Sequence, residues 1–282
     1  METAGDKYES VKKFIKEKGK NGVVIAFSGG IDSSTLAAIS QDILGGRAVA
    51  VTATSPTYTP EELEEAKSIA KEIGIKLVVV ETDELLNENF VSNPENRCYY
   101  CKKELLKRLL EKADELEFES VFEGTNASDL SDHRPGFKAV KETRRVYSPW
   151  VEASFTKEEI RGIAQKLGLS VKDKPANACL ASRIPFLERI TREKLERISK
   201  AERIVREVTG IRQLRVRDHN DLARIEVKKE ERPLICSTEI MDKVAYSLKA
   251  IGFKYVAIDA EGYRTGSMLS ALKEPGAQKT KI

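Results

Sequence analysis

The chain has 282 residues, of which 40% are hydrophobic and 33% are charged. This length and composition suit two globular domains with ordinary cores. The formal net charge of +3 gives no support for broad binding to nucleic acid or membranes, and no run of about 18 apolar residues is present to span a bilayer. The charged N-terminus also lacks the apolar core of a signal peptide. We therefore expect a cytoplasmic protein.

In the first half of the chain, apolar runs alternate with helical patterns. We expect strands at residues 22–27, 48–54, 76–81, 120–124 and 146–150, and helices at 33–44, 60–73, 102–116 and 157–167. Thr59 and Thr156 are the predicted N-caps of two of these helices. The alternation favours an α/β fold with a doubly wound, mostly parallel sheet, which we assign to residues 1–172. Ligands of such sheets bind at the carboxyl ends of the strands.

The pattern changes after residue 172. An irregular stretch at 173–189 precedes a helix at 191–208, strands at 211–217 and 222–228, a helix at 238–251 and a strand at 255–259. We expect a second, smaller α+β domain over residues 173–282.

A glycine-rich stretch, SGGIDSS, joins the first strand to the first helix at residues 28–34. Glycines let a ligand approach the backbone closely, and a helix N-terminus offers unpaired N–H groups, so the loop suits phosphate. Ser28, Ser33 and Ser34 add hydroxyl donors, whereas Asp32 would need a bridging cation such as Mg²⁺. The alternative is a tight strand–helix turn in which Asp32 and Ser33 are helix caps.

The loop lacks the lysine of a G-x-x-x-x-G-K-[ST] P-loop. It resembles the S-G-G-x-D-S signature of the PP-loop, or N-type, ATP pyrophosphatases. These enzymes split ATP between the α and β phosphates and transfer AMP to a substrate oxygen, after which a nitrogen or sulfur nucleophile displaces it. The resemblance implies an ATP site made of Ala26, Ser28, Gly29, Gly30, Asp32, Ser33, Thr54 and Gly124.

The chain has four cysteines, and Cys98 and Cys101 form a C-x-x-C pair before a predicted helix. This spacing lets two sulfurs reach one metal, but two ligands are not enough, and Cys179 is the other candidate. Arg183 beside Cys179 would favour its thiolate form. The alternatives are a structural zinc or redox dithiol for the pair and a buried, inert thiol for Cys179. We expect Cys236 to be buried in packing.

Four further motifs sharpen the resemblance: GTNASDLSDHRPGFKAVKE at 124–142, NACLASRIPF at 177–186, LRVRDHNDLARIEV at 214–227 and GYRTGSML at 262–269. With the PP-loop they resemble the LarE family over nearly the whole chain. LarE proteins are ATP-dependent sulfurtransferases that help to build the nickel-pincer nucleotide cofactor of lactate racemase. The resemblance implies that a carboxylate of pyridinium-3,5-biscarboxylic acid mononucleotide is adenylated and then converted to a thiocarboxylate.

The LarE family has two versions. In one, a cysteine that matches Cys179 gives up its own sulfur. In the other, three cysteines bind a [4Fe-4S] cluster whose open iron carries a sulfide. Because the chain has Cys98, Cys101 and Cys179, it resembles the cluster type. The resemblance thus implies Cys98, Cys101, Cys179 and Asp32 as catalytic residues, a supply of sulfide and a homo-oligomer.

Two expected strands carry charged residues at alternate positions. Arg215 and Arg217 share one face of the first, and Arg224 and Glu226 share one face of the second, so the pair could form a mixed pocket. The alternative is a solvated strand face with cross-strand ion pairs. The resemblance implies that Arg215 and Arg217 hold the phosphate of the substrate nucleotide, that Arg183 lines the same site and that Glu226 orients its partners.

Three other functions fit parts of the pattern. A PP-loop tRNA thiolase can also use three cysteines, but the low net charge and the lack of a separate RNA-binding module count against nucleic acid as a partner. An amide-forming N-type synthetase leaves the three cysteines unexplained. A nucleotide-binding regulatory module with structural zinc would not cleave ATP.

Overall fold

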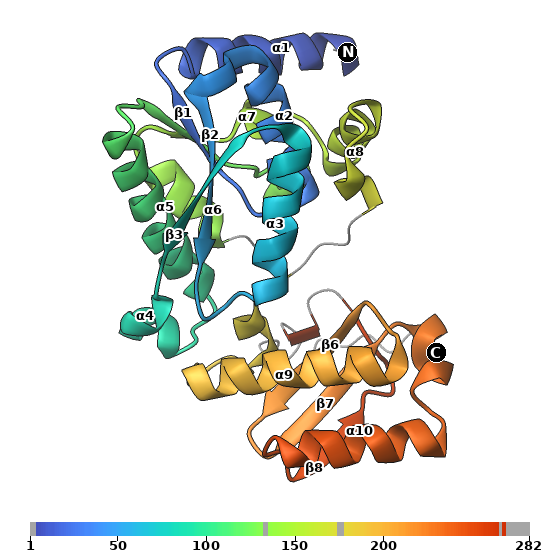
Figure 1. The fold of residues 1–282 in the computed structure, drawn as a ribbon. Coiled ribbons are helices and arrows are strands. Elements are labelled where there is room, and N and C mark those ends of the chain that lie inside the picture. Colours follow the sequence, from blue (N-terminus) through green and yellow to red (C-terminus); the bar gives the residue numbers. More distant parts are fainter. Residues whose placement is uncertain (1–3, 132–134, 174–177, 265–266, 269–282) are drawn as a thin grey trace. The chain divides into compact units, whose positions relative to one another are not determined.

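The computed structural model describes residues 4–131, 135–173, 178–264 and 267–268 (Figure 1). The chain divides into two compact units, Met1–Asn87 with Asn96–Asn177 and Glu88–Glu95 with Ala178–Ile282. The short segment Glu88–Glu95 therefore belongs to the second unit, although elements of the first unit flank it. No helix among the described residues has both the length and the apolar character needed to cross a membrane.

The first unit contains a five-stranded sheet in which all strands are parallel, in the order β3-β2-β1-β4-β5. The strands are β1 (Val23–Ala26), β2 (Ala48–Thr54), β3 (Lys76–Glu81), β4 (Ser120–Phe122) and β5 (Val146–Tyr147). The central strand β1 pairs with β2 on one side and β4 on the other. This arrangement confirms the predicted doubly wound α/β sheet.

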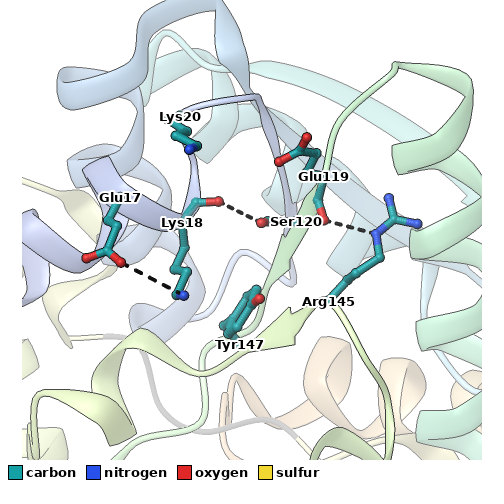
Figure 2. A pocket seen from close by; sticks show the side chains of 7 residues that line it. All are labelled: Glu17, Lys18, Lys20, Glu119, Ser120, Arg145 and Tyr147. Atoms are coloured by element: carbon teal, nitrogen blue, oxygen red, sulfur yellow. Dashed lines mark hydrogen bonds and ion pairs between the residues drawn. The ribbon is translucent and has the colours of Figure 1, made fainter.

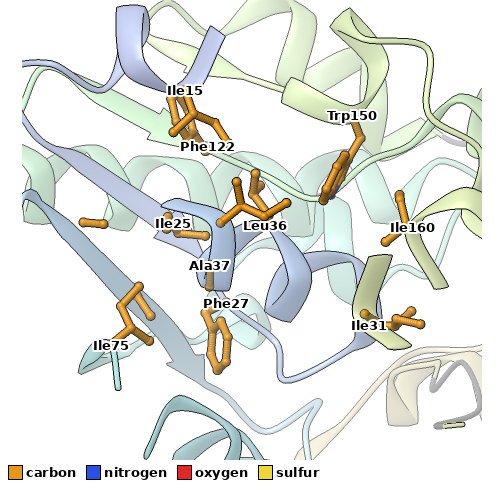
Figure 3. Packing of buried hydrophobic residues seen from close by; sticks show 14 of the residues in the cluster. Ile15, Ile25, Phe27, Ile31, Leu36, Ala37, Ile75, Phe122, Trp150 and Ile160 are labelled. Carbon is orange, nitrogen blue, oxygen red and sulfur yellow. The ribbon is translucent and has the colours of Figure 1, made fainter. Parts of the chain in front are cut away.

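Helices cover both faces of this sheet. They are α1 (Ala4–Lys18), α2 (Ile31–Leu44), α3 (Pro60–Ile73), α5 (Arg97–Glu115), α6 (Pro135–Glu142), α7 (Pro149–Glu152) and α8 (Lys157–Lys166). Alternate residues of β1 point to opposite faces: Ile25 packs in the cluster with α1, α2, α3, α7 and α8 (Figure 3), whereas Val24 packs in the cluster with α5 and α6. The strands are buried on both faces, as expected for a parallel sheet.

Local signals set most of these boundaries. Thr59 and Thr156 each form the predicted N-cap as part of a capping box, and Gly74 ends α3 in the left-handed conformation. The predicted strand at 146–150 is wrong beyond Tyr147, because Pro149 opens α7 instead. The predicted helix at 102–116 starts earlier, at Arg97, so that Cys98 and Cys101 lie in its first two turns.

The second unit is a smaller α+β structure. It contains α4 (Glu88–Val91), α9 (Arg192–Thr209), β6 (Leu214–His219), β7 (Leu222–Val227), α10 (Thr238–Ala250) and β8 (Tyr255–Ile258). Strands β6 and β7 are antiparallel, and β8 pairs with β7 in parallel. Val216 and Ile225 pack with residues of α9 and α10 in one apolar cluster, so the residues that alternate with them face the other side of the sheet.

Asn93 fastens the segment Glu88–Glu95 within the second unit. Its side-chain amide donates to the carbonyl oxygens of Pro185 at 2.6 Å and Glu188 at 3.0 Å, and the side chain is fully buried. Its φ of 55° lies in the left-handed region, which asparagine tolerates better than most residues. The side chain therefore replaces backbone pairing between two segments that are about ninety positions apart.

We expect Asn93→Ala to lower the free energy of unfolding of the second unit by about 2–3 kcal/mol, because buried carbonyl oxygens lose their donor. Urea unfolding followed by hydrogen exchange at residues 185–190 would measure this. Asn89→Ala is the matched control, since Asn89 is exposed in the same segment. Equal unfolding midpoints for the two variants would contradict the anchoring role.

Candidate active site

The parallel sheet of the first unit has a topological switch point between β1 and β4. The chain builds the sheet outward from β1 through β2 to β3, and then places β4 and β5 on the other side of β1. The loops that follow β1 and β4 therefore diverge, and a crevice opens at the carboxyl ends of these strands. The Ser28–Ser33 loop follows β1, and Gly124 follows β4, so the structure brings two of the predicted ATP-site segments together. The predicted residues Ala26 and Thr54 end β1 and β2 at the same edge.

The loop after β1 is held by its own hydroxyl groups. The Ser28 N–H donates to Ser33 Oγ at 3.2 Å, and Ser33 Oγ donates to the carbonyl of Gly30 at 3.2 Å. Gly29 has a φ of 64°, and a Cβ at this position would lie 3.0 Å from the Cα of Ala66, so glycine is required twice over. A Cβ at Gly124 would lie 3.1 Å from the Ser33 nitrogen, so the chain after β4 runs directly against the first turn of α2.

The N-terminus of α2 is not capped as the alternative interpretation expected. Gly30 is the N-cap residue, and no side chain bonds to the first turn from that position. Asp32 instead forms an ion pair with Lys157 Nζ at 2.8 Å and accepts a hydrogen bond from the Asn126 amide at 3.1 Å. The indole of Trp150 donates to the Asp32 carbonyl oxygen at 3.1 Å. The first turn of α2 thus offers N–H groups and a neighbouring cation.

Sequence reasoning missed Lys157. It lies at the first position of α8, directly after the N-cap Thr156, and its pairing with Asp32 joins residues that are 125 positions apart. The available signal was a lysine at the start of a helix predicted to follow the fifth strand, and this signal did not distinguish Lys157 from its many surface counterparts.

Glu123 was also missed, and it stabilises the loop after β4. It is only 2% exposed, and it accepts from Lys102 Nζ at 3.0 Å, from the Thr125 hydroxyl at 2.8 Å and from the Ser148 hydroxyl. Burial opposes ionisation of Glu123, but the charge of Lys102 and these hydrogen bonds outweigh it and hold the pKa of Glu123 below the usual glutamate value. The carboxylate thereby fixes the path of the chain toward Gly124.

The C-x-x-C pair lies at the N-terminal end of α5. Both cysteines are reduced, Cys98 is exposed, and Cys101 Sγ lies 4.0 Å from Glu84 Oε1. Within the described ranges, no three histidine, cysteine, aspartate or glutamate side chains are grouped closely enough to hold a metal ion. Cys179 is a residue of the second unit, where it is half-buried and directly precedes a short 3₁₀ turn, Leu180–Arg183.

Two expectations for the cysteines are corrected by the structure. Cys236 is exposed, because it lies in the loop before Ser237, the N-cap of α10, rather than on the apolar face of that helix. Arg183 contacts Cys179 through the main chain, since its Nη1 donates to the Cys179 carbonyl oxygen at 2.8 Å. The Ser182 hydroxyl donates to the same oxygen at 2.8 Å, so this contact fixes the backbone of Cys179.

In the second unit, the predicted arginine face is formed but is not solvated. Arg215 lies opposite Glu226, and Arg217 lies opposite Arg224. Arg215 and Arg217 are 4% and 5% exposed, and Glu226 is fully buried, so the alternative of a solvated strand face is wrong. The expected cross-strand ion pairs are present: Arg217 Nη2 lies 2.6 Å from Glu226 Oε2, and Arg224 Nη2 lies 3.3 Å from Glu226 Oε1.

This arginine cluster contains more buried positive than negative charge. Arg183, Arg215 and Arg217 are buried, and the buried carboxylates against them are Glu202 and Glu226. Burial opposes ionisation of Glu202, but Arg183 outweighs it and holds the pKa of Glu202 below its usual value. Burial and the charge of Arg183 lower the pKa of Arg215.

Two donors of the cluster, Arg215 Nη2 and Arg217 Nε, have no hydrogen-bond partner among the residues that the structure describes. Buried donors without partners are costly, and here they coincide with an excess of positive charge. The cluster is therefore suited to a bound anion.

A separate pocket lies at the opposite edge of the first sheet (Figure 2). Its volume is about 440 Å³, and it is lined by Glu17, Lys18, Lys20, Glu119, Ser120, Arg145 and Tyr147. Ser120 is the first residue of β4 and donates to the Lys18 carbonyl oxygen at 2.6 Å, while Arg145 Nε donates to the Glu119 carbonyl oxygen at 3.0 Å. These residues mark the amino-terminal edge of the strands, away from the switch-point crevice.

Comparison with known proteins gives consistent relatives. Residues 4–107 match the model of the NAD synthase family. The chain is 44% identical over 262 residues to the uncharacterized protein slr1717 of Synechocystis sp., covering 93% of this chain and 96% of that protein. It is 36% identical over 251 residues to the pyridinium-3,5-bisthiocarboxylic acid mononucleotide synthase of Lactiplantibacillus plantarum, covering 89% and 90%. It is 28% identical over 212 residues to a subunit of the glutamine-hydrolyzing GMP synthase of Thermoplasma acidophilum, covering 70% and 67%.

The depressed pKa of Glu123 predicts a pH-dependent contribution to stability. Since its folded pKa is lowered, the contribution is present above the unfolded value of about 4.3 and is lost as the pH falls through the folded pKa. We expect Glu123→Gln to lower the free energy of unfolding by about 2 kcal/mol at pH 7, and this difference to shrink below about pH 4.

Thermal melts of the wild type and Glu123→Gln between pH 3 and pH 7 would measure this difference. Glu119→Gln, at an exposed position near the start of the same strand, is the control and should match the wild type throughout. A difference for Glu123→Gln that is as large at pH 3 as at pH 7 would show that its carboxylate charge is not what stabilises the loop.

Proposed function

This chain belongs to the LarE family of PP-loop enzymes, and on that basis we propose that it converts carboxylates of pyridinium-3,5-biscarboxylic acid mononucleotide into thiocarboxylates for nickel-pincer nucleotide synthesis, with sulfide carried on a [4Fe-4S] cluster. It is an ATP-dependent enzyme that makes the thiocarboxylate by way of an adenylate. The observation that carries the proposal is the Ser28–Ser33 loop at the β1/β4 switch point, which suits the pyrophosphate that leaves in this chemistry.

In the proposed adenylation step, the substrate carboxylate attacks the α-phosphorus of ATP and pyrophosphate leaves. The N–H groups at the start of α2 and the hydroxyls of Ser28 and Ser33 would hold the departing phosphates. Lys157 would stabilise the charge that develops on them, because it already lies against the same helix turn through Asp32. Mg²⁺ held by Asp32 would supply further charge neutralisation.

Other residues of the proposed ATP site limit its shape. Gly124 and Gly29 leave no side chain between the backbone and the phosphates, and both positions exclude a Cβ by close contact. Ala26 and Thr54, at the ends of β1 and β2, would border the adenosine.

We further propose that the second unit binds the substrate phosphate. Arg215, Arg217 and Arg183 would receive this anion, which would pair the two unsatisfied donors of Arg215 and Arg217 and offset the excess positive charge. Glu226 would orient Arg217, since their side chains are 2.6 Å apart.

The sulfur source is assigned to the cysteines. The donor set fits an iron–sulfur cluster because Cys98, Cys101 and Cys179 are all reduced thiols, and two of them lie at the N-terminal end of α5, which favours thiolates. A cluster held by these three residues would supply a sulfide that displaces AMP from the acyl-adenylate. The remaining alternative is that Cys179 gives up its own sulfur.

The same ATP chemistry serves the rival functions. The match to the NAD synthase family over residues 4–107 and the likeness to a GMP synthase subunit both fall on relatives whose names give NAD and GMP as products. An amide-forming activity would need none of the cysteines, and a tRNA thiolase would need a tRNA acceptor. We also propose that the enzyme is cytoplasmic, forms a homo-oligomer and takes sulfide from a separate donor.

The test is to incubate anaerobically purified protein with ATP, sulfide and the biscarboxylic nucleotide, and to follow pyrophosphate and the replacement of oxygen by sulfur by mass spectrometry. We expect Cys179→Ala to abolish thiocarboxylate formation while pyrophosphate is still released. Cys236→Ala, which changes an exposed cysteine, is the control and should behave as the wild type. An amide product, or a thiocarboxylate from Cys179→Ala, would overturn the proposal.

We expect Lys157→Gln to lower the rate of pyrophosphate release about 100-fold, because a pre-positioned cation at the leaving group is lost. Lys166→Gln is the matched control, since Lys166 is exposed in the last turn of the same helix. Unchanged release in Lys157→Gln would remove Lys157 from the ATP site.

A further inference from the structure

A buried carboxylate next to Cys101 has no role in the function described so far. Glu84 is 2% exposed and lies two positions after Thr82, beyond the end of β3. Its Oε1 accepts from the Thr82 hydroxyl at 2.9 Å and lies 4.0 Å from Cys101 Sγ. Its Oε2 has no hydrogen-bond partner in the part of the chain that the structure describes.

The local fold does not require this carboxylate. Glu84 opens a 3₁₀ turn, Glu84–Leu86, but the cap of that turn is Asp83, whose side chain accepts from the Leu85 N–H at 3.1 Å. Thr82 is fixed independently, because its N–H donates to the Thr54 carbonyl oxygen at 2.9 Å. A structural role for Glu84 in capping or pairing is therefore already filled by its neighbours.

The contrast with Glu123 shows what is missing. Both glutamates belong to the first unit and are equally buried, at 2% exposure. Glu123 has a lysine at 3.0 Å and three hydroxyl or amide donors, whereas Glu84 lies against one hydroxyl and one thiol. A buried carboxylate without a cation costs several kcal/mol. The position of Glu84 is thus explained best by a cation that the chain itself does not supply.

The nearest side chain indicates what kind of cation this is. A thiol and a carboxylate side by side form a mixed sulfur and oxygen donor pair, which suits iron or zinc rather than magnesium. Cys98 lies on the same helix end as Cys101. We propose that Glu84 is a carboxylate ligand of the metal centre that Cys98 and Cys101 hold, an inference that rests on the proposed function.

Because no third ligand converges on Glu84 and Cys101 among the described residues, the pair would form one edge of the centre. The remaining ligands would come from Cys98 and Cys179 when the metal binds. The carboxylate would offset positive charge of the metal, and the metal would give Oε2 the partner that it lacks.

The test compares Glu84→Gln with the wild type after anaerobic reconstitution with iron and sulfide. We expect Glu84→Gln to release iron to a chelator about 10- to 100-fold faster and to show an altered electron paramagnetic resonance spectrum after reduction. Glu81→Gln is the matched control, because Glu81 is exposed at the end of the same strand. In the metal-free protein, Glu84→Gln should melt no lower than the wild type, since an unpaired buried charge is removed.

The outcomes separate this inference from the proposed function. If the wild type binds iron and Glu84→Gln has the same spectrum and release rate, the inference fails and the proposed function stands. If the wild type binds no iron, the proposed cluster fails and the inference fails with it. A lower melting temperature of metal-free Glu84→Gln would assign Glu84 a structural role and overturn the inference. Should Glu84→Gln not fold, Glu84→Asp, which withdraws the carboxylate, is expected to show the same faster release.

Discussion

The close approach of the chain after β4 to the first turn of α2 is the constraint on which the first unit depends. Gly124 can lie against Ser33 only because it has no side chain. This contact sets the width of the crevice at the switch point of the parallel sheet. Trp150 and Asn126 fix the same helix turn from the β4–β5 side through Asp32. The N–H groups of α2 are therefore pre-positioned before any nucleotide arrives, which is the condition for electrostatic catalysis without reorganisation.

Buried charge is treated differently in three places of this protein. Glu123 is fully satisfied by lysine and hydroxyl donors and acts as a support for a loop. The arginine cluster around Arg215 has more cations than carboxylates and retains unpaired donors. Glu84 is the opposite case, a carboxylate with no cation within the described ranges. Satisfied charge thus marks scaffold, while an imbalance of either sign marks a position where an external ion or ligand would complete the pairing.

The sequence predicted what periodicity and local chemistry encode. The parallel sheet, the capping boxes at Thr59 and Thr156, and the shared face of Arg215 and Arg217 follow from patterns of two to four residues. Lys157, Glu123 and Glu84 could not be found in this way, because each acquires its meaning from partners that are distant in sequence or absent from the chain. Cys236 was misplaced for a related reason: its position at a helix boundary, one residue before the N-cap, decides its exposure.

The anchoring of Glu88–Glu95 by Asn93 has a consequence for synthesis of the chain on the ribosome. Asn93 must wait for Pro185, its partner 92 residues later. At 5–20 residues per second, this wait lasts about 5–20 s. Phe90 and Val91, which are buried in the folded protein, have no native cover during that time. The nascent chain therefore carries a short apolar segment, directly before the cysteine pair, that a chaperone could protect until the second unit is complete.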